Sequence, residues 1–475
     1  MSKTEIRFGT DGWRAIIAAE YTFENVRFCA EGVARHLEAI GLADRGVVIG
    51  YDTRFGSADF AAASAEVIAA HGIQVYLFDR PAATPVACQA ILDKQAGGAI
   101  VITASHNPGS YNGFKFKPEY AGSAPPEVVE ALEAAIEAGQ AAGPPPRQAL
   151  DAAIASGAVL RFNPLPAYYA QVERLIDLDG VRAAGLSVVF DAMHATGAGV
   201  LDHLIGGGKT RVSEIRGEVN PAFPGMTSPE PIARNLEGLA AKIIAEGADV
   251  GLATDGDADR LGLYDERGEF IDQLKTYALL CYYFLEYRGE RGPLVRSMTS
   301  TRMIDCLGEL YGVPVHETAV GFKFLGPKMI DTGAIAAGEE SGGYAFGLHL
   351  PERDGCFAGL LILDLMARSG KTPTALVQEL FAKVGEHFYD RSDVHLAGGG
   401  REAAIARVAA ARPRVIAGRR VLGQDSLDGF RFEIEGGWLL VRPSGTEPLL
   451  RIYTEVTDAA LVGPVLAAGR ELAGV

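Results

Sequence analysis

The sequence has little of what marks several classes of metal and redox proteins. Its 475 residues include only five cysteines, with no CxxC pair among Cys29, Cys88, Cys281, Cys306 and Cys356. This scatter excludes the common thiolate zinc motifs, and it predicts reduced thiols in a cytoplasmic protein rather than a disulfide framework. The nine histidines form no HExxH pair, which removes the usual signature of a zinc hydrolase.

Long apolar runs and an excess of basic residues are also missing. No apolar stretch reaches the length of a membrane span, and the polar start MSKTEIRFG predicts no signal peptide. The 44 Lys and Arg residues against 60 Asp and Glu residues leave a formal charge of −16. We therefore expect neither a membrane nor a nucleic acid as partner, and an anionic small molecule would have to be drawn by local cationic pockets.

Two nucleotide-binding motifs are incomplete. Residues 206–210, GGGKT, resemble the end of a P-loop, but His203 stands where the leading glycine is required. No GxGxxG follows the first predicted strand, so a dinucleotide site has no support. We interpret residues 206–210 as a surface turn.

The length of the chain and its alternation of elements predict four domains. A chain of 475 residues is too long for one core. Strand and helix patterns alternate through 1–150, 151–272 and 273–386, which predicts three α/β domains with mixed, mainly parallel sheets. Residues 387–475 differ, because strand patterns flank Gly436-Gly437 as in a hairpin, and we expect an α+β domain there.

The first of four motifs, VITASHNPG, spans residues 101–109. The apolar run 99–102 predicts a buried strand, and Ser105 and His106 stand in the polar turn that follows it. Ligands of α/β folds bind at the carboxyl ends of strands. Lys115, ten residues further on, can bring a cation back to the same edge. An ordinary turn with a satisfied hydroxyl is the alternative interpretation.

The second motif, DGDADR, spans residues 255–260 and follows the apolar run Val250–Ala253. Its alternating carboxylates, Asp255, Asp257 and Asp259, would repel one another without a cation. Ligand sets made only of oxygen suit magnesium or calcium, and Arg260 beside them favours a site for a metal and a phosphate. A solvated acidic loop is the alternative.

The third and fourth motifs are glycine-containing loops. GEESGG, residues 338–343, presents Glu339 and Ser341, which could hold sugar hydroxyls, although a helix cap or a flexible turn would use the same residues. RPSGTEP, residues 442–448, offers a cation, hydroxyls and backbone N–H groups for an anion, with Arg451 close behind. A plain turn between strands is the alternative for this loop.

In this order, the four motifs resemble those of the α-D-phosphohexomutase family, and most of all those of its phosphoglucomutases and phosphomannomutases. The opening FGTDGWR, residues 8–14, also matches the start of that family. The resemblance therefore runs along nearly the whole chain. It implies three related α/β domains and a distinct fourth domain around a central cleft.

The resemblance also implies an activity, namely the interconversion of hexose 1-phosphate and hexose 6-phosphate. Ser105 would carry a phosphoryl group, and hexose 1,6-bisphosphate would be both intermediate and activator. Mg²⁺ would be held by the serine and the three aspartates of the second motif. The residues implied near the transferred group are Arg14, Ser105, His106, Lys115, Asp255, Asp257, Asp259 and Arg260, with Arg14, His106 and Lys115 as candidates for proton transfer.

The resemblance also bears on the choice of sugar. The implied substrate contacts are Lys323, Glu339, Ser341, Arg442, Ser444, Gly445, Thr446 and Arg451. Phosphoglucosamine mutases generally have a histidine where this chain has Gly343, and the segment 321–323 resembles one of phosphoglucomutases, so glucose is our first choice and mannose the second. A phosphoglucosamine mutase, a non-catalytic sugar-phosphate binding protein and a phosphatase stay open, as do a monomer and a homodimer.

Overall fold

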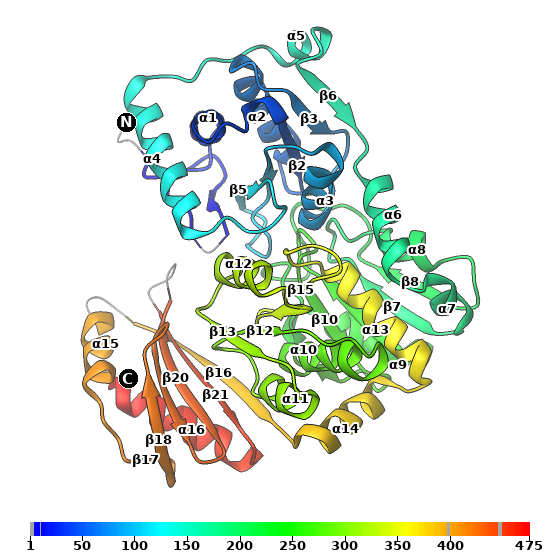
Figure 1. Ribbon diagram of the computed structural model, residues 1–475, viewed down its shortest axis with the longest axis vertical. Coiled ribbons are helices and arrows are strands. Elements are labelled where there is room, and N and C mark those ends of the chain that lie inside the picture. Colours follow the sequence, from blue (N-terminus) through cyan, green and yellow to red (C-terminus); the bar gives the residue numbers. More distant parts are fainter. Residues whose placement is uncertain (1–3, 10, 397–399, 445–448) are drawn as a thin grey trace.

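The computed structural model describes residues 4–9, 11–396, 400–444 and 449–475. Four sheets follow one another along the chain, each with its own helices (Figure 1). The first three sheets combine parallel and antiparallel pairings, whereas all pairings of the last sheet are antiparallel. The predicted fold class, three α/β units and one α+β unit, is confirmed.

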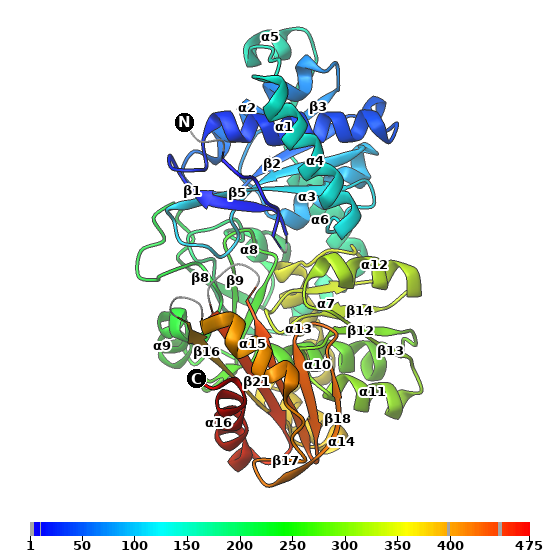
Figure 2. The same ribbon diagram turned by 90° about the vertical axis from the view of Figure 1, so that its left-hand side faces the viewer.

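The first unit contains a six-stranded sheet in the order β1-β5-β4-β2-β3-β6. Its strands are β1 (Trp13–Ile16), β2 (Val47–Tyr51), β3 (Val75–Phe78), β4 (Gly98–Ile102), β5 (Tyr111–Pro118) and β6 (Val159–Phe162). Its helices are α1 (Phe23–Ala39), η1 (Ala43–Arg45), α2 (Ser57–Ala70), α3 (Thr84–Lys94), α4 (Pro126–Ala142) and α5 (Leu150–Ala155). Figure 2 shows α1 and α4 on one side of this sheet and α3 on the other.

Local sequence explains where α1 begins and which face it buries. The Thr22 side chain accepts a hydrogen bond from the N–H of Asn25, which satisfies a helix N–H that would otherwise lack a partner. Val26, Val33 and Leu37 recur at helical spacing and are fully buried.

Two strands of the first sheet depart from the sequence-based expectation. β5 pairs antiparallel with β4, and the predicted elements include no strand over 111–118. β6 lies beyond residue 150, where we predict the first domain to end, yet it pairs with β3 and completes the first sheet. The domain limits stay a prediction, and because of β6 we propose to move the first one to residue 163.

The second unit contains a five-stranded sheet in the order β11-β10-β9-β7-β8. Its strands are β7 (Ser187–Asp191), β8 (Arg211–Ile215), β9 (Val250–Thr254), β10 (Leu261–Tyr264) and β11 (Phe270–Ile271). Its helices are α6 (Leu165–Leu175), α7 (Leu178–Ala183), α8 (Val200–Ile205), η2 (Ala233–Asn235) and α9 (Glu237–Glu246). The segment 206–210, which resembles a P-loop, forms a turn after α8, as predicted.

The third unit contains a four-stranded sheet in the order β13-β12-β14-β15. Its strands are β12 (Leu294–Ser297), β13 (Val315–Thr318), β14 (Ala336–Gly338) and β15 (Tyr344–Phe346). Its helices are α10 (Gln273–Tyr282), which continues into the π-helical turn η3 (Tyr283–Tyr287), α11 (Met303–Tyr311), α12 (Phe322–Thr332), α13 (Gly355–Ser369) and α14 (Pro373–Val384). α13 also packs on β9 and β10, so it joins the second and third units.

The last unit contains a six-stranded sheet in the order β16-β21-β20-β19-β18-β17. Its strands are β16 (Phe388–His395), β17 (Val415–Ile416), β18 (Arg419–Asp425), β19 (Phe430–Ile434), β20 (Gly437–Pro443) and β21 (Leu449–Val456), and its helices are α15 (Gly400–Ala410), η4 (Ala459–Leu461) and α16 (Val462–Ala473). The hairpin that we predict around Gly436-Gly437 joins β19 to β20.

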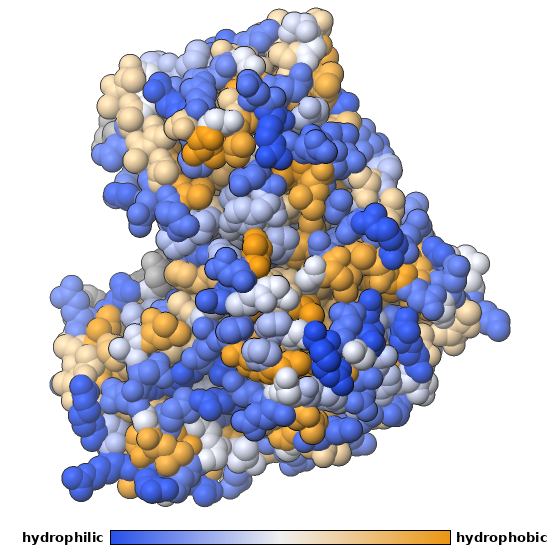
Figure 3. Space-filling view, viewed as in Figure 1, coloured by the Kyte–Doolittle hydropathy of each residue, from blue (hydrophilic) through white to orange (hydrophobic). Residues whose placement is uncertain are grey.

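Core packing divides the molecule into a large body and a smaller one. One continuous apolar core runs through the first three units, from Ile6 to Leu380. The last unit has a core of its own, between its sheet and the helices α15 and α16. The surface is hollowed between the first and the last unit (Figure 3). Among the described residues, no helix combines the length and the apolarity that a membrane crossing requires.

Candidate active site

The serine loop connects β4 to β5 at the carboxyl edge of the first sheet. Ser105 has a φ of +51°, a left-handed conformation that costs a non-glycine residue about 1–2 kcal/mol. Its N–H donates to Thr103 Oγ1 at 2.9 Å. Its Oγ donates to Asp255 Oδ2 at 2.8 Å, across the boundary between the first and second units. The loop therefore holds the hydroxyl against the acidic motif.

His106, the next residue of the loop, brings a ring nitrogen close to the Ser105 hydroxyl. Its Nδ1 lies 3.3 Å from Ser105 Oγ. Burial lowers the pKa of His106 well below its ordinary value, and nearby cations, first Arg260 and then Arg14 and Arg54, lower it further. The imidazole is therefore neutral near pH 7 and has a ring nitrogen that can accept a proton.

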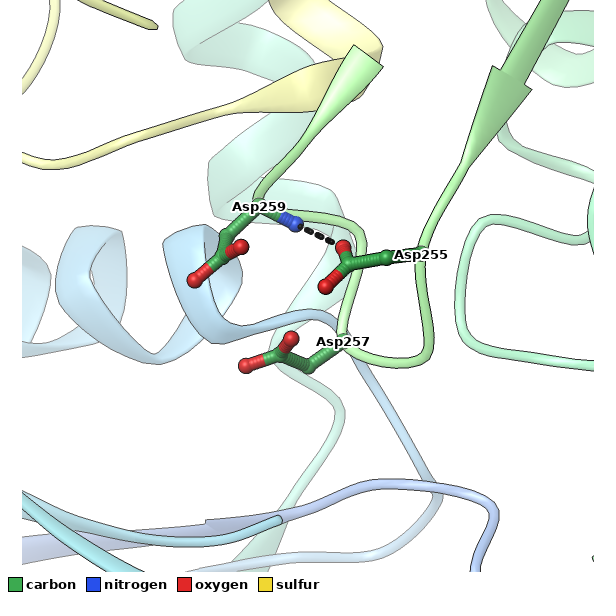
Figure 4. A group of neighbouring side chains, drawn as sticks. All are labelled: Asp255, Asp257 and Asp259. Atoms are coloured by element: carbon green, nitrogen blue, oxygen red, sulfur yellow. Dashed lines mark hydrogen bonds between the residues drawn. The ribbon is translucent and has the colours of Figure 1, made fainter. Parts of the chain in front are cut away.

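The acidic loop joins β9 to β10 and carries three fully buried carboxylates. Asp255, Asp257 and Asp259 each present an oxygen within 4.8 Å of the others, and their side chains extend toward one region (Figure 4). Asp255 Oδ1 accepts from the N–H groups of Asp259 at 2.9 Å and Arg260 at 3.1 Å, which closes the loop into a tight turn. A Cβ on Gly256 would lie 2.2 Å from the carbonyl oxygen of Ser105, so the two loops can approach this closely only with glycine there.

The chemistry of these donors fits a magnesium ion. Asp257 Oδ1 and Asp259 Oδ1 are buried without a hydrogen-bond partner, which is costly unless a cation or water completes them. Burial, and then repulsion from Asp259 and Asp257, raise the pKa of Asp255 well above its ordinary value. A hard cation with oxygen ligands would relieve both penalties.

Lys115 projects from β5 into the same cluster. Its Nζ lies 2.8 Å from both Asp11 Oδ2 and Asp257 Oδ2 and 3.4 Å from Asp259 Oδ2. Burial opposes charge, but the carboxylates outweigh it and raise the pKa of Lys115 above its ordinary value. In this arrangement Lys115 is an ammonium that offsets the charge of the aspartates, and its role in proton transfer stays a prediction.

The second and third motifs are joined directly through their backbones. Arg260 and Gly343 form an antiparallel bridge, and the N–H of Leu261 donates to the carbonyl of Gly342 at 2.9 Å. The guanidinium of Arg260 pairs with Glu230 at 3.2 Å, and its Nε lies 4.0 Å from Asp259 Oδ1. The acidic loop and the GEESGG loop therefore form one continuous rim.

Glu339 is a buried carboxyl of this rim. Its Oε2 accepts from Ser341 Oγ at 3.2 Å. Burial raises the pKa of Glu339 to about 7, although the nearby Arg353 opposes the rise. A carboxyl that is protonated over part of the neutral range can donate or accept a hydrogen bond to a sugar hydroxyl.

Arg353 is a site residue that the sequence analysis did not identify. Its guanidinium donates to Asp11 Oδ2, lies 2.9 Å from Asp259 Oδ2 and pairs with Glu352 at 3.1 Å. It also lies over the ring of Phe322, 5.2 Å from the centroid. The arginine immediately precedes the Asp354 cap of α13, so it connects that helix with the first and second units. No spacing rule relates it to partners as distant as Asp11.

A second buried pair fastens the first unit to the third. Lys117 Nζ lies 2.6 Å from Glu352 Oε2 and 2.8 Å from Asp11 Oδ1, and both Lys117 and Glu352 are fully buried. Ser123 Oγ donates to the same glutamate oxygen at 2.7 Å. The pair is satisfied on several sides, as a buried ion pair must be to be tolerated.

The fourth motif lies on the last sheet. Arg442 in β20 stands opposite Arg451 in β21, and its Nε lies 2.9 Å from Asp428 Oδ1. Asp428 Oδ2 accepts from the N–H of Val320 at 3.1 Å, beside the segment that carries Lys323. The two arginines therefore form a basic edge of the last unit, and one carboxylate connects this edge to the third unit.

The structure brings most of the predicted site residues to one place. Arg14 donates to Asn107 Oδ1 at 2.8 Å and so contacts the serine loop. The residues gathered around the serine and acidic loops are Arg14, Ser105, His106, Lys115, Asp255, Asp257, Asp259, Arg260, Glu339 and Ser341. Lys323 lies on α12, Arg442 and Arg451 lie on the last sheet, and Ser444 directly follows β20, whereas Gly445 and Thr446 are outside the described residues.

Four domain families match the chain in sequence order. Their descriptions are phosphoglucomutase/phosphomannomutase alpha/beta/alpha domain I at residues 5–142, domain II at 166–268, domain III at 272–384, and the C-terminal domain at 398–471.

Two relatives of this chain carry different names. "Phosphoglucomutase/phosphomannomutase" of Thermococcus kodakarensis is 30% identical over 466 residues, 98% of this chain and 98% of that protein. "Probable phosphoglucosamine mutase" of Pyrococcus horikoshii is 30% identical over 448 residues, 94% of this chain and 93% of that protein. Overall identity therefore does not separate the two names.

A solved structure has the same fold over its whole length. It is a crystal structure from Thermus thermophilus named "putative phosphomannomutase", with a TM-score of 0.86 and 34% sequence identity. The match covers 99% of this chain and 100% of that one.

Proposed function

The chain belongs to the phosphoglucomutase/phosphomannomutase family, part of the α-D-phosphohexomutases that its motifs resemble, and on that premise we propose that it interconverts glucose 1-phosphate and glucose 6-phosphate. The observation that carries the proposal is the contact of Ser105 Oγ with Asp255 Oδ2 at 2.8 Å, inside a cluster of three buried carboxylates. A hydroxyl beside a cation site, with further cations around it, suits phosphoryl transfer, which depends mainly on positioning and charge stabilisation.

Ser105 is the residue that we propose to carry the phosphoryl group. Its Oγ gives that group to a hydroxyl of the bound hexose phosphate, which yields hexose 1,6-bisphosphate. The bisphosphate turns over within the site, and its other phosphate returns to Ser105. Hexose 1,6-bisphosphate added from outside would phosphorylate resting enzyme and so act as an activator.

Asp255, Asp257 and Asp259 would hold the magnesium ion, which would supply positive charge beside the phosphorylated serine. Arg14, Lys115 and Arg260 add cationic side chains around the same point. Such charges stabilise the equatorial oxygens of a phosphoryl group in transfer.

Proton transfer needs a group that can both accept and release a proton beside Ser105. His106 supports this role, because its Nδ1 lies 3.3 Å from Ser105 Oγ and its burial keeps the ring neutral. Arg14 and Lys115 stay as alternatives, and Lys115 would first have to lose its contacts with Asp11 and Asp257.

Glu339 and Ser341 would hold ring hydroxyls, while Arg442, Ser444, Gly445, Thr446 and Arg451 would seat the phosphate that does not react. Lys323 would approach the sugar phosphate from α12. The reaction requires both orientations of the sugar, so this seat must accept a phosphate from either end of the molecule.

Gly343 and Arg353 support glucose over an amino sugar. A Cβ on Gly343 would lie 2.3 Å from Arg353 Cδ, so the histidine that phosphoglucosamine mutases generally have here would require Arg353 to move. Mannose phosphate stays the second choice of substrate, and a phosphoglucosamine mutase stays the alternative enzyme, because a relative 30% identical bears that name. We further propose a cytoplasmic enzyme that acts on small sugar phosphates as a monomer or homodimer.

A coupled assay with the 1-phosphates of glucose, mannose and glucosamine, in Mg²⁺ and catalytic hexose 1,6-bisphosphate, tests the proposal. We expect the highest kcat/KM with glucose 1-phosphate. Ser105→Ala should lower kcat at least about a thousandfold while retaining substrate binding. A preference for glucosamine 1-phosphate would move the assignment to a phosphoglucosamine mutase, and normal turnover by Ser105→Ala would exclude the phosphoserine route.

A further inference from the structure

Arg54 lies beneath the serine loop and contacts its main chain at four points. It follows the end of β2, and its side chain is fully buried. Its two terminal nitrogens donate to backbone carbonyls, those of Ser105 at 2.6 Å, Asn107 at 2.6 Å, Pro108 at 2.8 Å and Tyr111 at 3.1 Å. One side chain therefore spans the whole loop between β4 and β5.

The charge of Arg54 is balanced where it is buried. Asp52 Oδ2 lies 3.2 Å from Arg54 Nε, and the ring of Phe223 lies 5.0 Å from the guanidinium carbon. Asp52 is itself fixed, because its Oδ1 accepts from the N–H of Arg54 at 2.9 Å and from Ser57 Oγ at 2.7 Å. A guanidinium that donates four hydrogen bonds and pairs with a fixed carboxylate has little freedom to move.

The loop above it needs such an anchor. Ser105 occupies the left-handed region, a strained conformation that persists only when its surroundings hold it. The loop is held at the carbonyl of Ser105, to which Arg54 donates and against which Gly256 packs. The direction of that carbonyl is linked through the Cα to the direction of the side chain, and hence to the 2.8 Å contact between Ser105 Oγ and Asp255.

We propose that Arg54 is a positioning residue for the phosphoryl transfer, acting through the backbone of residues 105–111. This inference rests on the proposed function. Arg54 keeps Ser105 Oγ in line with the acidic loop, and its cation offsets four carbonyl dipoles that would otherwise repel a phosphorylated serine. A lysine cannot replace it, because a single ammonium does not have the planar fork that reaches carbonyls on both sides.

The test is Arg54→Lys, with Arg45→Lys as its matched control. Arg45 also donates to a backbone carbonyl, that of Gln95, but on the exposed far side of the same unit. For Arg54→Lys we expect kcat to fall about 10- to 100-fold with KM changed less than about threefold, since a misplacement near 1 Å has this cost. Hydrogen exchange of peptides covering residues 103–112 should accelerate, while the rest of the first unit is unchanged.

A second variant keeps the test decisive if Arg54→Lys does not fold. Asp52→Asn preserves the volume of the charge partner and should shift kcat and loop exchange in the same direction by a smaller factor. Wild-type kcat in both variants would overturn the proposal, as would an increase in exchange spread over the whole first unit. Faster exchange confined to the loop, in a chain whose wild type has no mutase activity, would refute the proposed function and leave the anchoring of the loop standing.

Discussion

The two ends of the candidate site are built in different ways. At the serine end, the first three units share one apolar core and are fastened by buried ion pairs such as that of Lys117 with Glu352. At the phosphate end, Arg442 and Arg451 lie on a sheet with its own core. The serine end is therefore prearranged by folding, whereas the phosphate end depends on how the last unit docks.

The docking contacts explain this difference. The last unit contacts the third through Arg302 with Glu433 and Arg431 with Glu317, whose glutamate side chains are 23% and 21% exposed. A small apolar cluster around Met298 and Trp438 adds to them. Polar, partly exposed interfaces of this type permit relative movement of domains. We expect changes at the serine end to alter catalysis and changes at the phosphate end to alter binding.

The largest effect expected from the comparison is at the acidic loop. Asp257→Asn keeps the shape of the side chain but removes a carboxylate from the metal site, and should lower kcat at least about a hundredfold. Mg²⁺ raises the melting temperature of a protein that binds it in the folded state, and this increase should be absent in the variant. Calorimetry with and without Mg²⁺ checks the second expectation independently of activity.

The matched control for Asp257→Asn is Asp79→Asn. Asp79 also follows the end of a strand, β3, but is partly exposed and pairs with Arg80. The Asp79→Asn variant should keep both the wild-type turnover and the wild-type increase in melting temperature with Mg²⁺. Full activity of the wild type after removal of metal with EDTA would contradict the metal assignment.

A smaller effect, on binding, is expected at the phosphate end. Arg442→Ala should raise KM about 10- to 100-fold for both glucose 1-phosphate and glucose 6-phosphate, since charge-assisted hydrogen bonds contribute about 1.5–3 kcal/mol. kcat should change less than about threefold. Arg420→Ala is the control, because Arg420 lies on the same sheet, is 71% exposed and pairs with Glu435.

Steady-state kinetics in both directions would reveal a failure of this expectation. An effect on one isomer alone would mean that the seat is specific for one orientation. A loss of kcat with unchanged KM would place Arg442 functionally at the serine end and remove the distinction between the two regions.

The sequence predicted the loops of the site better than the groups beneath them. Ser105, Asp255 and Glu339 follow apolar runs, and the carboxyl ends of strands converge in α/β units, so their meeting could be expected. Arg353 and its partner Asp11 are 342 positions apart, and no local pattern reveals which distant charges a fold will bury together. The order of the motifs, through the family that they resemble, indicated that these loops form one site. The periodicity of the apolar residues alone did not.

Arg54 was missed for a related reason. It stands in the loop after β2, two residues beyond Asp52, and so repeats the pattern of a polar group following a buried strand. That pattern was present in the sequence, but Arg54 belongs to none of the four motifs. Because β5 was not predicted, nothing indicated that a loop of eight residues between β4 and β5 would need support.

The smallest expected effect concerns the exclusion of water from the serine end, which the pH dependence of stability reports through the buried carboxyl of Glu339. Burial raises the pKa of Glu339 to about 7 from an ordinary value near 4.5. Between about pH 4.5 and 7 the folded state therefore binds more protons than the unfolded state, and this group's contribution to the free energy of unfolding falls as the pH rises. Above about pH 7 both states are ionised, and the contribution stays at its lowest.

Glu339→Gln removes this titration, so the variant should gain stability relative to the wild type between pH 5 and pH 8, by about 1–3 kcal/mol. Denaturant unfolding at the two pH values measures the gain, with Glu269→Gln as a control at an exposed position. If the stability difference between Glu339→Gln and wild type were the same at both pH values, the carboxyl would be solvated. The serine end would then be open to solvent, and the contrast between the two regions would not hold in solution.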